Sequence, residues 1–330
     1  MGLGGKHMQC GFGGISSRFS RLQATFAFGT PALAAWAAMP LRYLLLFLGV
    51  FACSTSAIFI RASTTDPFVL TALRLVLASA ILAPVFFALR RRHPGSFTRQ
   101  HLRRTHLPAL VLAFHLISWT LGARATAVAQ STLIVNLVPI AVPFFLYWIV
   151  RERITRPEVV GTVLAIVGLV TLSVKDVLHG GGSAAGDAIC FVSMLLFALY
   201  LSLGRRNRDF ASIWLYVIPV YAQASVVCLL VALPRLHTFA ATSAREWSLM
   251  LGLAVVPTVC GHSLLNAAMR RIRGQIVSLC NVSQFVFASI MGFFLFGEVP
   301  RAVFYVAAAI VVTGVVTVVL GTPPEPEVAA

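Results

Sequence analysis

The sequence predicts an all-α integral membrane protein with ten transmembrane helices arranged as two inverted five-helix repeats. Composition is the first observation, because 58% of the 330 residues are hydrophobic and only 11% are charged. Soluble domains carry about 25% charged residues, so water is not the main solvent of this chain. The other two observations are a series of long apolar runs and a set of spacings that recur in both halves of the chain.

The apolar runs each approach the roughly 17–25 residues that a helix needs to cross a bilayer. They are continuous rather than alternating, which favours helices over the strands of a membrane barrel. The predicted spans are residues 43–60, 67–89, 107–123, 129–150, 159–174, 186–203, 211–233, 247–269, 275–296 and 302–320.

The recurring spacings indicate two copies of one unit. Glu152 precedes Gly168 by 16 residues, and Glu298 precedes Gly314 by the same 16 residues, at an offset of 146. Two further pairs of like residues stand 147 positions apart: His115 with His262, and Arg124 with Arg271. The offsets of 146 and 147 differ by one residue, so a shift of one position between the copies reconciles them.

Four segments follow from this pattern. Residues 1–41 contain no acidic residue and many small ones, which is typical of a disordered cytoplasmic tail or of a gene start placed before a true initiator at Met39. A targeting segment at 25–38 is the alternative, but Pro31 interrupts it, so we do not expect a membrane helix there. Residues 42–178 form the first repeat and 184–321 the second, and 322–330 form a C-terminal cytoplasmic tail.

The distribution of Lys and Arg predicts the orientation. With the N-terminus inside, the inside segments carry 19 of these residues and the outside loops carry 6. Cytoplasmic loops are enriched in positive charge, so both termini of this multi-pass membrane protein are expected in the cytoplasm. The basic charge therefore faces anionic lipid, and no nucleic-acid partner is expected.

An odd number of spans per repeat places the second repeat upside down in the membrane. Inverted repeats are a feature of many secondary transporters, whose substrate site lies at the repeat interface near the middle of the membrane. No P-loop, HExxH, GxSxG or Cys/His metal spacing is present, and the six cysteines show no paired spacing. We therefore expect neither an enzyme nor a metal site nor a cofactor.

Short motifs occur through residues 43–320 in a fixed order: Ser54-Thr55-Ser56-Ala57-Ile58-Phe59-Ile60-Arg61, Ala72-Leu73-Arg74, His115-x3-Trp119, Pro139 with Glu152, Gly186-Asp187, Ala198-Leu199-Tyr200, Gly204-Arg205-Arg206, Pro257-Thr258-x2-Gly261-His262-x3-Asn266 and Phe296-Gly297-Glu298. Together they resemble the EamA-type members of the drug/metabolite transporter superfamily, with two EamA domains. The resemblance implies an inner-membrane secondary carrier that usually exports small metabolites.

Three positions depart from the pattern of the family that the chain resembles. Phe285 stands where the second repeat normally has a proline, and Gln284 stands where relatives often have a glutamate. A carboxylate there would be a natural proton carrier, so the departure argues against proton coupling through this position. Arg151 replaces the usual glycine before Glu152.

Polar residues inside spans are the candidate substrate-binding residues, because they are expensive in lipid and usually face a cavity. His115 and Trp119 lie one turn apart, and Thr258, His262 and Asn266 share one helical face. The alternative is hydrogen bonding between helices, at about 0.6 kcal/mol each. Further candidates are Tyr200, Ser56, Ser131 and Gln284, and weaker ones are Ser54, Gln130, Thr132 and Ser283.

Arg74 lies inside its predicted span, where its guanidinium would bind an anionic substrate group. The alternative is that it pairs with a helix C-terminus or with a carboxylate such as Asp187. Glu152 and Glu298 end spans near Arg153 and Arg301, which predicts helix-end ion pairs or, alternatively, a gate. Pro139 is a further gating or helix-end candidate, because a proline can kink its helix.

The expected function is secondary active export of a small metabolite, amino acid or drug-like solute by alternating access, driven by an unidentified coupling ion. Uptake or exchange is one alternative, and a non-transporting sensor or scaffold is an alternative of another class. A homodimer is left open.

Overall fold

The structure is a computed structural model that describes residues 29–125, 131, 134–178, 183–239, 243–296 and 302–322. These residues are helical apart from short turns, and no strand occurs among them. The chain divides into two compact units, residues 1–44 and 45–330. Both predicted repeats, from residue 45 onward, lie in the second unit, so they pack together instead of forming separate domains.

The first repeat contains six helices in the described residues. They are α2 (Gly29–Ser54), α3 (Ser56–Ala62), α4 (Pro67–Arg92), α5 (Arg99–Ala125), α7 (Val138–Val150) and α8 (Arg156–Leu178). Because α2 begins at Gly29, residues 29–41 of the predicted tail are helical. Residues 1–28 lie outside the described part of the chain.

The second repeat is described by α9 (Ala184–Arg206), α10 (Ile213–Ala232), the 3-10 helix η1 (Leu233–Phe239), α11 (Ala244–Leu253), the π-helix η2 (Ala254–His262), α12 (Ser263–Arg271), α13 (Gly274–Val282), α14 (Gln284–Phe296) and α15 (Ala302–Gly321). The segment α11–η2–α12 is continuous and corresponds to one predicted span.

Eight helical stretches of the described residues are long and apolar enough to cross a membrane. They are Leu41–Ala62, Pro67–Arg92, Arg99–Ala125, Ala184–Arg206, Ile213–His237, Ala244–Arg271, Gly274–Met291 and Ala302–Gly321, with Ile134–Val150 as a shorter apolar helix. The fifth predicted span lies in α8, which is helical but is not one of the eight. The all-helical membrane fold is thus confirmed, and ten crossings stay a prediction.

Local sequence explains where α4 begins. Asp66 precedes the helix, and its carboxylate accepts hydrogen bonds from the backbone N–H groups of Phe68 at 2.9 Å and Val69 at 3.4 Å. Pro67 occupies the first helical position, where a missing N–H costs nothing. The cap fixes the end of α4 at the turn from α3.

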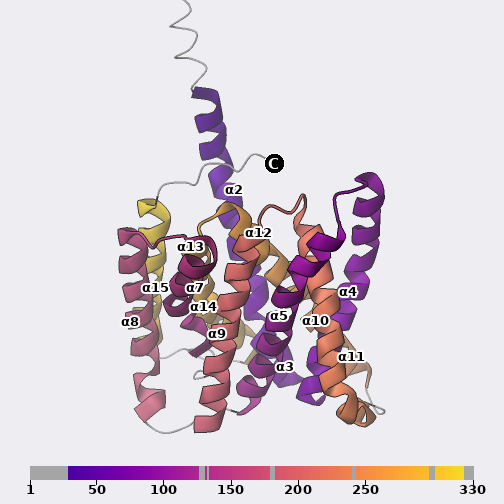
Figure 1. The fold of residues 1–330 in the computed structure, drawn as a ribbon. Helices are drawn as coiled ribbons and strands as arrows, with labels where there is room; N and C mark the ends of the chain where they lie inside the picture. Colours follow the sequence, from indigo (N-terminus) through magenta and orange to yellow (C-terminus); the bar gives the residue numbers. More distant parts are fainter. Residues whose placement is uncertain are drawn as a thin grey trace, which may run out of the picture. The chain divides into compact units, whose positions relative to one another are not determined.

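Helices that correspond in the two predicted repeats pack against each other in opposite directions. Asp66, before α4, pairs with Arg235, after α10, at 3.1 Å, so α4 and α10 are antiparallel. Helices α8 and α15 lie side by side (Figure 1). In their contact, Gly161 faces Val318 and Gly168 faces Val311, so these helices are also antiparallel. A Cβ atom at Gly161 would lie 2.8 Å from the carbonyl oxygen of Gly314, so glycine permits this close approach.

The loops that the charge count places inside contact one another. Arg104, near the start of α5, pairs with Asp209 of the α9–α10 loop at 2.6 Å. Arg273, between α12 and α13, pairs with Glu158 at the start of α8 at 2.6 Å. Arg270 donates to the carbonyl oxygen of Arg208 at 3.0 Å. These contacts gather the predicted inside segments at one end of the helices.

The predicted outside loops meet in the same way. Glu246 at the start of α11 accepts hydrogen bonds from Ser63 at 2.6 Å and from the hydroxyl group of Thr65 at 2.9 Å. Arg124 donates to the carbonyl oxygen of Thr65 at 2.7 Å. Arg124 binds the α3–α4 turn, and Arg270 binds the α9–α10 turn. Arg270 is therefore the structural counterpart of Arg124, and the prediction that Arg271 is its counterpart is wrong.

A break occurs at matching positions in the two repeats. Leu137 forms a turn before α7, and Ser283 forms a turn before α14, at the 146-residue offset. Pro139 follows the first break, within the opening turn of α7. The second break forms without a proline, and the ring of Phe285 packs edge-on against Phe304 at 5.7 Å. The break therefore does not depend on the proline that the family pattern has here.

Candidate functional site

Arg74 is the centre of a buried polar group between the repeats. The side chain is fully buried, with 1% of the residue exposed. Its Nε donates to the hydroxyl of Thr258 at 2.5 Å, and its Nη1 lies 3.5 Å from the hydroxyl of Ser56. The indole N–H of Trp119 donates to the same hydroxyl at 3.4 Å. Residues from α3, α4, α5 and η2 therefore converge on one cation, and the alternative pairing of Arg74 with Asp187 is not found.

A π-helical turn positions Thr258. Pro257 lacks a backbone N–H and interrupts regular hydrogen bonding, and residues Ala254–His262 adopt the wider π-helix. The Thr258 hydroxyl donates five residues back to the carbonyl oxygen of Leu253 at 2.9 Å, so its lone pairs are available to Arg74. The proline thus shapes the place where the second repeat meets the arginine.

An aromatic and imidazole group lies next to this arginine group along η2 and α12. His115 stacks on Phe197 with ring centroids 4.7 Å apart, and His262 meets Phe197 edge-on at 5.8 Å and Tyr200 at 6.1 Å. Asn266 donates to the Tyr200 hydroxyl at 2.8 Å. Helices α5, α9, η2 and α12 supply these five side chains, so both repeats contribute. We call the two groups together the central cluster.

Hydrogen bonds fix the orientation of His115. Its Nδ1–H donates to the backbone carbonyl oxygen of Ser193 at 3.0 Å, because that carbonyl accepts only. The Ser193 hydroxyl contacts the backbone carbonyl oxygen of His115 at 3.2 Å. In the neutral imidazole with this tautomer, the other ring nitrogen, Nε2, is an acceptor.

Three buried polar atoms of the central cluster have no hydrogen-bond partner among the described residues. They are Nη2 of Arg74, Nδ1 of His262 and Oδ1 of Asn266. A buried polar atom without a partner costs about 1–3 kcal/mol, so such atoms usually have a role. Together they offer an N–H donor on a cation, an amide oxygen acceptor and an imidazole nitrogen that can donate or accept.

The other predicted site residues fall in different places. Gln284 is half-buried and donates to the side-chain oxygen of Asn281 at 2.5 Å, outside the central cluster. Ser131 is buried, between residues whose structure is not described. The backbone carbonyl oxygen of Pro139 accepts from Gln275 at 3.0 Å, which joins the break in repeat one to α13. Glu298, Gln130 and Thr132 lie outside the described residues, as does Arg301.

Sequence reasoning missed three members of the cluster's surroundings. Ser193 and Phe197 precede Tyr200 by seven and three residues on α9, so extending the face of Tyr200 would have found them. Tyr221 of α10 donates to the backbone carbonyl oxygen of Thr258 at 3.3 Å and contacts the hydroxyl of Ser263 at 3.1 Å. Its span is apolar on all sides, so no pattern marked it.

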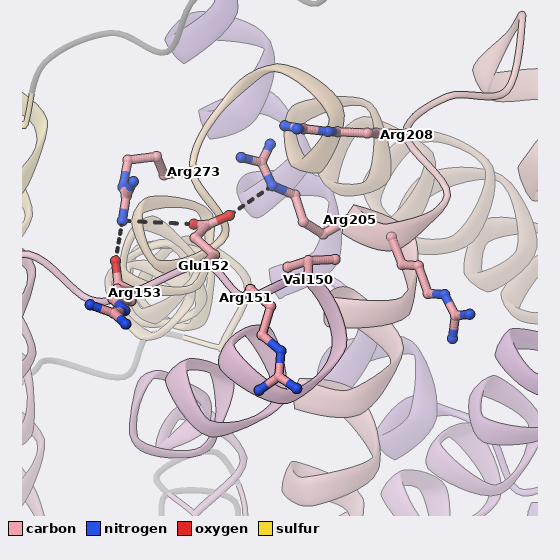
Figure 2. Close-up of a pocket in the computed structure, with 8 residues that line it drawn as sticks. Val150, Arg151, Glu152, Arg153, Arg205, Arg208 and Arg273 are labelled. Atoms are coloured by element: carbon pink, nitrogen blue, oxygen red, sulfur yellow. Dashed lines mark hydrogen bonds and ion pairs between the residues drawn. The ribbon is translucent and has the colours of Figure 1, made fainter.

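Glu152 joins the end of α7 to the second repeat. Its carboxylate accepts from Nε of Arg205 at 2.9 Å and from the backbone N–H of Gly274 at 3.0 Å, and it lies 4.0 Å from Arg273. The sequence placed Glu152 near Arg153, but the partners of its carboxylate are Arg205 and Arg273 of the second repeat. Figure 2 shows Arg205 and Arg273 both directed at this carboxylate. The predicted helix-end ion pair is present, as a contact between the repeats.

An open cavity of about 510 Å³ surrounds Glu152. Its lining is Val150, Arg151, Glu152, Arg153, Arg205, Arg206, Arg208 and Arg273. It lies at the predicted inside ends of the helices and shares no residue with the central cluster.

Asp209, in the loop between α9 and α10, also carries a charged contact at this end. Arg104 donates through both terminal nitrogens to the two carboxylate oxygens, at 2.8 and 2.6 Å. These hydrogen bonds lower the pKa of Asp209 below its ordinary value, against a smaller opposing effect of burial. The carboxylate is more than half exposed, so this is a surface ion pair.

Comparison with known proteins now adds to this geometry. The EamA-like transporter family model matches the chain twice, over residues 40–174 and 184–320. The chain belongs to the EamA-like transporter family. The two matched segments coincide with the two predicted repeats, which confirms the resemblance found from the sequence.

The fold of this EamA-like transporter is also found among solved structures. A crystal structure titled "Crystal structure of protein" is similar with a TM-score of 0.70, at 16% sequence identity, over 84% of this chain and 97% of that chain. It is one of 29 matching chains. No curated protein matches the sequence. At this identity the structural similarity supports the fold alone.

Family membership makes the chain a multi-pass membrane transporter, so its partners are a small-molecule solute and membrane lipid. The family consists of transporters, not enzymes. In the parts of the chain that the structure describes, no group of three His, Cys, Asp or Glu residues is arranged to hold a metal ion. The central cluster is therefore the candidate functional site of this transporter.

Proposed function

We propose that this EamA-like transporter is a secondary active carrier with ten membrane-crossing helices. It exports a small metabolite, amino acid or drug-like solute across the inner membrane by alternating access. The observation that carries the proposal is the central cluster, in which both repeats place side chains around three unpartnered polar atoms. A solute that satisfies these atoms recovers the free energy that their burial costs.

Arg74 favours a solute with an anionic group. A buried guanidinium without a carboxylate partner is unfavourable, and a bound carboxylate would both neutralise it and reach its free Nη2. His262 and Asn266 would then recognise the rest of the solute by hydrogen bonds. The rings of Phe197 and Trp119 supply apolar contact area at the same place.

Alternating access is supported by the arrangement of the repeats. The antiparallel packing of α4 with α10 and of α8 with α15 is what inverted repeats require. At the predicted inside end, Glu152 holds the first repeat to Arg205 and Gly274 of the second. Rocking of the repeats that breaks these contacts opens the inside path, and re-forming them closes it.

The orientation follows from the basic loops. The predicted inside segments gather at one end of the helices and carry most of the Arg residues. The positive-inside rule assigns that end to the cytoplasm, with both termini on that side. A gradient of an ion or a second solute supplies the energy, and His115 and His262 are the titratable groups placed to couple a proton to solute movement.

Comparative profiling of exported metabolites tests the proposal. Bacteria that express the wild-type chain are compared with an empty vector and with a His115→Ala/His262→Ala variant at equal membrane abundance. A His93→Ala/His237→Ala variant is the control, because both of its histidines are exposed. We expect one class of solute in the medium of the wild type and the control only.

The other outcomes separate the alternatives. Equal export by the histidine variant would keep the exporter and remove the central cluster as its site. Depletion of a solute from the medium would indicate uptake or exchange. Profiles identical to the empty vector across anionic, neutral and cationic solutes would contradict transport and favour a sensor or scaffold.

A further inference from the structure

The cavity around Glu152 has an unusual charge for the end of a membrane helix bundle. Six arginines and one glutamate line its volume of about 510 Å³. The arginines come from three segments of the chain: Arg151 and Arg153 after α7, Arg205, Arg206 and Arg208 at the end of α9, and Arg273 before α13. Cations in this number around one cavity repel one another unless an anion is present.

Glu152 does not neutralise this charge. It pairs with Arg205 at 2.9 Å and lies 4.0 Å from Arg273, which itself binds Glu158 at 2.6 Å. In the described part of the chain no carboxylate pairs with the guanidinium groups of Arg151, Arg153 or Arg206, and all three residues are exposed. The cavity therefore keeps several guanidinium groups available to an external anion.

The backbone at Arg151 gives a second, independent observation. Arg151 ends α7 with φ of 58°, the left-handed conformation that favours glycine at this place. An arginine there is conformationally unfavourable, and its guanidinium lies over the ring of Tyr147 at 5.5 Å instead of forming an ion pair. Figure 2 shows its side chain directed away from Glu152. Arg151 thus carries a positive charge at a position whose backbone conformation favours glycine.

The geometry points to a binding site for a phosphate group in this cavity, separate from the central cluster. Guanidinium groups bind phosphate oxygens through paired N–H donors. A phosphate diester or pyrophosphate therefore matches several guanidinium groups better than a single carboxylate does. The phosphate comes from an anionic phospholipid headgroup or from a free phosphate compound. Basic pockets between helices at the cytoplasmic face suit the headgroup.

Binding of two probes to the purified full-length protein tests this site. Pyrophosphate is titrated by calorimetry against protein in phosphatidylcholine nanodiscs, and retained phosphatidylglycerol is measured by native mass spectrometry. The test variant is Arg153→Gln/Arg206→Gln, which leaves the ion pairs of Glu152 intact. The control is Arg91→Gln/Arg92→Gln, which removes the same charge from exposed residues at the end of α4.

We expect binding of at least one probe to weaken by about tenfold or more in the test variant and to stay unchanged in the control. Loss of phosphatidylglycerol alone identifies a lipid headgroup, and loss of pyrophosphate alone identifies a soluble phosphate. A second variant, Arg151→Gly, should weaken the same probe while its Tm is unchanged or higher, because glycine relaxes the backbone. Equal binding in test variant and control, or no binding of either probe, would overturn the inference.

Discussion

The imidazole rings of His115 and His262 lie 6.3 Å apart, although 147 positions separate them in the sequence. One ring comes from α5 of the first repeat and the other from η2 of the second. They meet because the two repeats interlock instead of folding apart. Side chains from both repeats at one place are what a site at the interface between two repeats would contain.

Substitution of Arg74 should change which solutes leave the cell. Arg74→Gln keeps a hydrogen-bonding side chain but removes the positive charge, so export of anionic solutes should fall by about tenfold or more. Arg74→Lys keeps the charge but lacks the planar fork, and it should restore only part of the activity. Export of neutral and anionic solutes by each variant is measured at equal abundance, and an equal fall for both classes would indicate a structural role for Arg74.

Loss of the Glu152 carboxylate should weaken the contact between the repeats. Glu152→Gln leaves Arg205, which is almost fully buried, without its charged acceptor. We expect a loss of about 1–3 kcal/mol, measured as a lower Tm of the purified protein. Asp209→Asn removes a charge from an exposed pair and serves as the control, with a loss below about 1 kcal/mol. Equal Tm values for the two variants would show that the Glu152 contact is not a stabilising one.

The close approach of α8 and α15 should not tolerate a side chain at Gly161. A Cβ atom there would lie 2.0 Å from a methyl carbon of Val318 and 2.8 Å from the carbonyl oxygen of Gly314. Gly161→Ala should therefore separate the helices and cost about 1–3 kcal/mol by thermal denaturation. Val163→Leu, on the exposed side of α8, is the matched control.

A second substitution tests the cause of this loss. Val318→Ala removes the methyl group that clashes first, so Gly161→Ala/Val318→Ala should recover part of the stability. Recovery should be incomplete, because the carbonyl oxygen of Gly314 still lies within 3 Å of the added carbon. A double variant less stable than Gly161→Ala alone would contradict this explanation.

Acid should remove the small contribution of the Asp209–Arg104 pair. The pKa of Asp209 is lower in the folded protein than its unfolded value of about 3.9. Such a shift stabilises the protein above the unfolded pKa, and the contribution is lost as pH falls through the folded value. The Tm difference between wild type and Asp209→Asn should thus be small at pH 7 and shrink progressively as the pH falls below the unfolded pKa. A difference that grows on acidification would contradict the assignment.

The sequence predicted most of the fold because membrane helices are fixed by composition and length. It also predicted the repeats, since Gly168 of α8 and Gly314 of α15 each lie against the partner helix, Gly168 at Ala307 and Val311 and Gly314 at Gly161. The partner of Glu152 was not predictable, because Arg205 lies 53 residues away and only the three-dimensional turn at Arg151 brings it near. Helicity of residues 29–41 was missed for a different reason, since Pro31 and Pro40 argued against a helix there.

The central cluster was predicted in part. Periodicity placed Thr258, His262 and Asn266 on one face, but it gave no information about which helices that face would meet. Tyr221 carried no signal, since its span is apolar on every side. Arg74 was recognised as costly in lipid, but the sequence did not show its partner. That partner is the hydroxyl of Thr258, 184 positions away in the sequence.

Direct binding of the exported solute to the purified protein tests the central claim, that the solute occupies the cluster between the repeats. Calorimetry compares wild type, His115→Ala/His262→Ala and the exposed control His93→Ala/His237→Ala, using the solute that export profiling identifies. We predict that the Kd rises by about tenfold or more in the first variant and is unchanged in the control. The same Kd for all three proteins would contradict the claim and place the solute elsewhere.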